Sequence, residues 1–122
     1  MNTRGEGARG EYIARDYLKR QGYEITDINF SCKLGEIDII ARCSSTLVFV
    51  EVKSRNFESY GSGYDAVTRA KMRKIIGAAR TYISMHGLHD VNVRFDVVYV
   101  CRDECRLVKG AFDLNDAYAR GM

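Results

Sequence analysis

The chain has 122 residues, of which 46% are hydrophobic and 29% are charged, as in globular proteins that bury a core within one domain. This composition excludes a disordered chain, a collagen-like chain and a disulfide-stabilised miniprotein, and no apolar run is long enough to span a membrane. Because the first residues lack the apolar segment of a secretory signal, we expect a cytoplasmic protein. The length of the chain predicts a single domain over residues 1–122.

The net charge is only +3, but it is unevenly distributed. Between Lys53 and Arg80 there are seven basic and two acidic residues, a net charge of +5. A basic segment on an otherwise weakly acidic chain is typical of proteins that bind nucleic acids. A solvated helix face would carry the same charges, so the charge alone leaves both interpretations open.

Residue patterning predicts the elements in chain order. They are a helix over 7–21, strands over 23–30, 36–41 and 47–53, a loop over 56–63, a helix over 65–86 that ends at Gly87, a strand over 93–100, a short strand over 106–109 and a helical turn or two over 114–120. The long helix joins the third and fourth strands, which indicates a crossover. We therefore expect an α/β fold in which a mixed sheet of about five strands is flanked by helices.

The four cysteines are expected to be reduced thiols. Their spacing differs from that of zinc-binding pairs, and no histidine lies near them; they are Cys32, Cys43, Cys101 and Cys105.

Charged residues interrupt the second and third predicted strands, which are otherwise apolar. Residues two apart project from the same side of a strand, so Glu36 is a neighbour of Asp38 and Glu51 is a neighbour of Lys53. If the two strands pair antiparallel, Asp38 lies opposite the region of Glu51. Buried carboxylates need a compensating cation, and Mg2+ suits one or two carboxylates together with water and a substrate phosphate.

Lys53 fits the same hypothesis, because an ammonium can orient a water nucleophile or neutralise charge that develops on a phosphate. A surface ion pair between Glu51 and Lys53 is the plainer interpretation. Glu51 and Lys53 indicate a catalytic site rather than a surface ion pair only in combination with Asp38.

Two further carboxylates need partners. Glu11 falls on the apolar stripe of the first helix, where it either joins the same site or pairs with Arg15 on the surface. Asp96, flanked by Arg94, is either a structural ion-pair partner, the interpretation that we favour, or a second metal ligand.

Basic side chains of the +5 segment are candidates for phosphate contact. Lys71 and Lys74 lie along the apolar stripe of the long helix, at the end that we expect nearer the site. The predicted nucleic-acid-binding residues are Arg55, Arg69, Lys71 and Lys74.

These motifs resemble known nucleases. The run Gly35–Asp38 followed by Val48–Arg55 resembles the bipartite motif of the PD-(D/E)xK nuclease superfamily, with Ile37 in place of the proline. Over residues 5 to 117 the chain resembles the uncharacterised bacterial YraN family, which is similar to archaeal-type Holliday junction resolvases. The matching features are Gly10–Glu11, Tyr17–Leu18, the two motif strands, Tyr60–Gly61, Lys71 and Arg94–Val98.

The resemblance implies a restriction-endonuclease-like fold, dependence on Mg2+ (or Mn2+) and a possible homodimer. It also implies that Asp38 and Glu51 are metal ligands together with the carbonyl of Val52, that Lys53 is the catalytic lysine and that Glu11 is the helical acidic residue. The leading hypothesis is a metal-dependent DNA endonuclease, with branched or junction DNA as one candidate substrate. The alternatives are a non-catalytic nucleic-acid-binding accessory protein and a structural interaction domain.

Overall fold

The computed structural model describes the backbone of residues 3–55 and 66–119 and the side chains of residues 8–54 and 66–119. The elements in chain order are α1 (Thr3–Arg20), β1 (Glu24–Cys32), β2 (Gly35–Cys43), β3 (Thr46–Arg55), α2 (Arg69–His86), β4 (Asn92–Cys101), β5 (Glu104–Phe112) and α3 (Leu114–Tyr118). No helix within these described ranges is long and apolar enough to cross a membrane.

The five strands form one sheet in the order β1-β2-β3-β4-β5. The pairs β1–β2, β2–β3 and β4–β5 are antiparallel, whereas β3 and β4 are parallel. Parallel neighbours need a crossover connection, and α2 lies within that connection as predicted. The expected α/β fold, a mixed five-stranded sheet flanked by helices, is confirmed.

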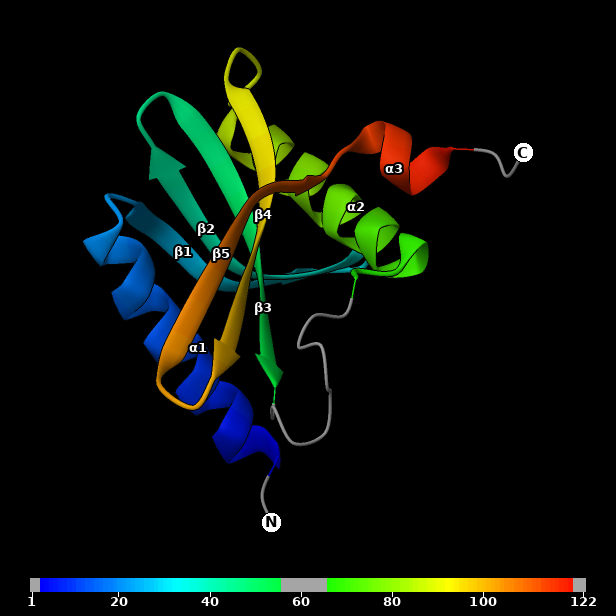
Figure 1. The fold of residues 1–122 in the computed structure, drawn as a ribbon. Coiled ribbons are helices and arrows are strands. Elements are labelled where there is room, and N and C mark those ends of the chain that lie inside the picture. Colours follow the sequence, from blue (N-terminus) through cyan, green and yellow to red (C-terminus); the bar gives the residue numbers. More distant parts are fainter. Residues whose placement is uncertain (1–2, 56–65, 120–122) are drawn as a thin grey trace.

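Helices cover both faces of the sheet (Figure 1). Side chains alternate along β3, as the strand period requires. Val48 and Val50 pack in one cluster with Leu18 of α1, whereas Leu47 and Phe49 pack in a second cluster with α2. The sheet is therefore apolar on both sides, and α1 is separated from α2 by its full thickness.

The helix predicted for 65–86 begins later than expected, at Arg69. Thr68 has an extended backbone, and its side chain accepts a hydrogen bond from the Lys71 N–H, so it caps the helix. The other end is as predicted, because Gly87 adopts the left-handed conformation that closes many helices. The first residue of the predicted helix lies outside the described residues.

The first four strands lie within two residues of their predicted bounds. The last strand was predicted too short: β5 covers Glu104–Phe112 rather than 106–109. It lies at the edge of the sheet and exposes most of its side chains, so its polar residues obscured the strand pattern. The predicted loop 56–63 lies outside the described residues.

Candidate active site

The two carboxylate-bearing strands, β2 and β3, are paired along only part of their length. Pairing between β2 and β3 runs from Cys43 opposite Thr46 to Ile39 opposite Val50. Past this point, the start of β2 stays paired with β1, whereas the end of β3 stays paired with β4. Figure 1 shows the β1–β2 hairpin leading toward α2 while β3 continues away from it. We call this division, flanked by Asp38 and Glu51, the fork.

Asp38 occupies the base of the fork. Its Oδ2 accepts a hydrogen bond of 2.7 Å from the Val52 N–H, so the carboxylate takes the place of the next backbone acceptor in the ladder. The side chain is half-buried. This bond fixes Asp38 against β3 and places it beside Glu51.

Glu51 lies on the side of the sheet that α2 covers, and only 8% of the residue is exposed. Burial raises the pKa of its carboxyl to about 8, with further contributions from a hydrogen bond to Asp38 and from the charge of Asp38. Lys71 and Lys53 act in the opposite direction. The two carboxyls therefore form a close pair whose charge Lys71 and Lys53 compensate only in part.

Two lysines approach this pair. Lys71 of α2 places its Nζ 3.6 Å from Glu51 Oε2. Lys53, half-buried, follows Glu51 by two residues on β3 and so projects from the same side of the sheet. The sequence predicted Lys53 at the site but assigned Lys71 to phosphate binding alone; its contact with Glu51 joins residues 20 positions apart in sequence, and no sequence pattern indicates it.

Glu11 approaches from the other side, on α1. It is half-buried, and its pKa is raised first by burial and then by the negative charge of Asp38. Arg15, the alternative partner, lowers this pKa without offsetting the rise. α1 approaches β3 closely at Gly10, where an added Cβ would overlap the Ser54 hydroxyl unless that hydroxyl rotated away.

The donor set of the fork suits Mg2+ better than zinc. Within the described residues no group of three or more His, Cys, Asp or Glu side chains could hold a metal ion. Zinc sites typically use three or four protein ligands, whereas Mg2+ usually takes one or two carboxylates and completes its shell with water and substrate phosphate. Asp38 and Glu51 supply two carboxylates, and the Val52 peptide lies against Asp38.

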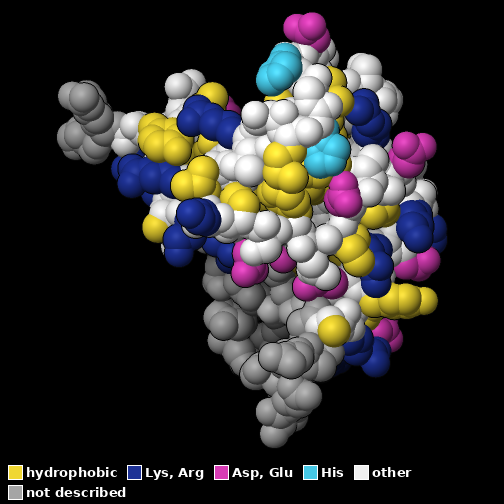
Figure 2. All heavy atoms as spheres, turned by 180° about the vertical axis from the view of Figure 1, so that it is seen from behind, with side chains coloured by type: hydrophobic (Ala, Val, Ile, Leu, Met, Phe, Trp, Pro, Cys, Tyr) yellow, Lys and Arg dark blue, Asp and Glu magenta, His cyan; other side chains and the backbone are white. Residues whose placement is uncertain are grey.

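The start of α2 is basic. Its first turn contains no acidic residue, although the helix dipole favours acidic groups there. Figure 2 shows basic side chains gathered over this part of α2, next to a group of acidic side chains. Arg69 and Lys74 are exposed, as a phosphate-binding role requires, and the side chain of Arg55 lies outside the described residues.

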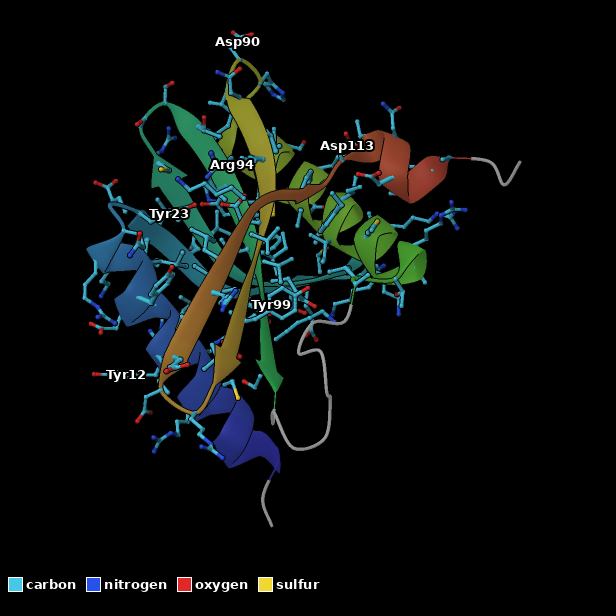
Figure 3. All side chains as sticks on the ribbon, in the orientation of Figure 1. Tyr12, Tyr23, Asp90, Arg94, Tyr99 and Asp113 are labelled. Carbon is cyan, nitrogen blue, oxygen red and sulfur yellow. The ribbon has the colours of Figure 1, made fainter. Side chains whose placement is uncertain are left out.

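Tyr99 of β4 is a neighbour of the site that sequence reasoning missed. It lies beside Lys53 in the parallel ladder and is 9% exposed. Figure 3 shows it next to β3, on the side of α2. The only sequence signal is its place two residues after Val97 in an apolar strand, which predicts a core residue.

Asp96 belongs to a separate, structural network, as predicted. It is fully buried, and its carboxylate accepts hydrogen bonds from Arg94, from the Tyr23 hydroxyl and from the Gly110 N–H, at 2.7 to 2.9 Å. Figure 3 shows Tyr23 and Arg94 close together, and an Arg94 nitrogen donates to the Tyr23 oxygen at 2.9 Å. The described partners of Asp96 thus have a structural role and lie away from the fork.

Known sequences place the chain in a family. The profile of the uncharacterised protein family UPF0102 matches residues 10–100. The chain belongs to the UPF0102 family. Its relatives include UPF0102 proteins of Pelobacter propionicus (48% identical, covering 84% of this chain and 75% of the relative) and Lachnoclostridium phytofermentans (45%, 93% and 97%).

A third UPF0102 protein, of Desulfosudis oleivorans, is 47% identical over 94% of this chain and 96% of the relative. The family assignment agrees with the resemblance to the YraN family. The segment that matches the UPF0102 profile includes Glu11, both carboxylates of the fork, Lys53 and Lys71.

Proposed function

We propose that this UPF0102 protein is a divalent-metal-dependent endonuclease that hydrolyses phosphodiester bonds of DNA, with branched or junction DNA as one candidate substrate. The observation that carries the proposal is the convergence of Asp38 and Glu51 at the fork with Lys53 and Lys71 beside them. A purely structural pair of carboxylates would be costly at such a buried position. A cation bound to both carboxylates would offset that cost and act as the Lewis acid for phosphodiester hydrolysis.

Each residue of the fork has a distinct role in this proposal. Asp38, Glu51 and the Val52 carbonyl would hold Mg2+ or Mn2+, which supplies Lewis-acid stabilisation of the phosphate. Lys53 orients the attacking water and stabilises the negative charge that develops in the transition state. Glu11 accepts a hydrogen bond from a water at the Asp38 side of the cluster.

Nucleic acid would be held by basic residues near the fork. The start of α2 presents backbone N–H groups and positive charge without an acidic side chain, a combination that suits phosphate groups. Arg55, Arg69, Lys71 and Lys74 are the proposed phosphate contacts, and this role would account for the +5 segment.

The test separates chemistry from binding. In the Lys53→Ala variant, affinity for a four-way DNA junction should be close to that of the wild type, because the lysine acts mainly in the transition state. Single-turnover cleavage with Mg2+ should fall on the order of a hundredfold or more. Lys53→Arg should not restore the rate, because the planar guanidinium does not replace a compact ammonium.

The same assay distinguishes the alternatives. Labelled junction, duplex and single-stranded DNA are compared with Mg2+ and with Mn2+. Cleavage that persists in Lys53→Ala would place the activity in another centre or in a contaminant. A wild-type protein that binds these substrates tightly and cuts none of them would favour the non-catalytic accessory protein.

A further inference from the structure

The ion pair between Lys71 and Glu51 is unlike the structural ion pair between Arg94 and Asp96. Lys71 Nζ lies 3.6 Å from Glu51 Oε2, and 41% of the lysine side chain is exposed. Arg94 holds Asp96 at 2.8 Å, and the Asp96 side chain has no exposed surface. Charge-assisted hydrogen bonds between nitrogen and oxygen measure about 2.7–2.9 Å, so Lys71 contacts Glu51 as a nearby charge rather than as a fixed donor.

Lys71 is anchored through its backbone and not through its ammonium. The Lys71 N–H donates to the Thr68 side chain at 3.1 Å in the cap of α2. The side chain beyond it is a flexible stem of four carbons that can move without disturbing the helix. Glu51, in contrast, is held in the buried wall of the fork.

We infer that Lys71 is an exchangeable counter-ion, whose ammonium stays beside Glu51 in the metal-free site and is displaced by the divalent ion. This inference rests on the proposed function, because it requires the metal to bind Asp38 and Glu51. Two cations that need the same carboxylate weaken each other's binding, and each lowers the affinity of the other by the same factor. The displaced ammonium becomes available to a substrate phosphate only when the metal has arrived.

Replacing Lys71 should therefore tighten metal binding. In the Lys71→Met variant, which keeps an unbranched apolar side chain, calorimetric titration with Mg2+ at pH 8.5 should give an affinity on the order of tenfold higher than that of the wild type. Lys71→Arg, which retains a cation, should bind Mg2+ no more tightly than the wild type. Arg80→Met is the matched control, because it removes one exposed positive charge farther along α2.

Thermal unfolding gives a second readout. Without metal, Lys71→Met should melt a few degrees below the wild type at this pH, because Glu51 loses its nearby cation. Saturating Mg2+ should remove that difference, since the ion then compensates the carboxylates in both proteins. Arg80→Met should show no such metal-dependent convergence.

The outcomes separate this inference from the proposed function. Wild-type binding of Mg2+ that is lost in Asp38→Asn, with Lys71→Met binding no more tightly, would overturn the counter-ion role and leave the metal site intact. The counter-ion role would also be overturned, with the metal site intact, if Arg80→Met tightened Mg2+ binding as much as Lys71→Met. Absence of Asp38-dependent binding in both the wild type and Lys71→Met would overturn the metal site and the inference together.

Discussion

At the scale of single residues, the buried carboxyl of Glu51 should destabilise the metal-free protein when it is charged. Its pKa is raised from 4.5 to about 8 by burial and by Asp38, so between these values the folded state holds a proton that the unfolded state has lost. Stability should fall as pH rises through this window, by at most about 1.4 kcal/mol per unit. The loss should level off at about pH 9, where the folded protein has also lost this proton.

Glu51→Gln removes this titration. We expect the metal-free variant to exceed the wild type in stability by an amount that grows from pH 5 to pH 9, measured by urea denaturation with a chelator present. Adding Mg2+ should stabilise the wild type but not the variant. Glu24→Gln, at an exposed carboxyl, is the control. A Glu51→Gln protein that is less stable than the wild type at pH 9 would contradict the assignment.

At the scale of elements, the hydrogen bond from the Val52 N–H to Asp38 closes the fork at its base. Asp38→Asn retains a side-chain oxygen that can accept this bond, so its stability should stay near that of the wild type while metal binding is lost. Asp38→Ala leaves the N–H without its acceptor and should cost about 1–3 kcal/mol. Equal losses in the two variants, by chemical denaturation, would show that the bond does not contribute.

The elements were largely predictable from sequence, whereas the fork was not. Strand β3 is β-branched and aromatic, and α2 ends at a glycine, so local patterns were sufficient. The pattern around Asp38 correctly placed it near Glu51, because a short connection joins two antiparallel strands. The same residues do not indicate that the pairing of β2 with β3 stops at Ile39. This end point depends on where β2 stays paired only with β1, and β3 only with β4.

At the scale of the whole molecule, the distribution of charge matters more than its sum. The net charge of +3 is small, but basic side chains gather over the start of α2 (Figure 2). Removing phosphate contacts there should weaken DNA binding and flatten its dependence on salt. In the Lys71→Ala/Lys74→Ala variant the log–log slope on duplex DNA should fall by roughly 0.9 for each lost contact.

Lys19→Ala is the control for this measurement, because Lys19 is exposed on α1 and α1 lies on the opposite face of the sheet from α2. Its slope should match that of the wild type. An unchanged slope in the α2 double variant would show that this helix faces away from the nucleic acid.

The most direct measurement of the central claim is anomalous diffraction from crystals soaked in Mn2+. We expect a strong peak at the fork, about 2.0–2.6 Å from carboxylate oxygens of both Asp38 and Glu51, and its disappearance in crystals of Asp38→Asn. A well-diffracting soaked crystal with no peak at the fork, or with a peak that persists unchanged in Asp38→Asn, would contradict a metal site built on these two carboxylates.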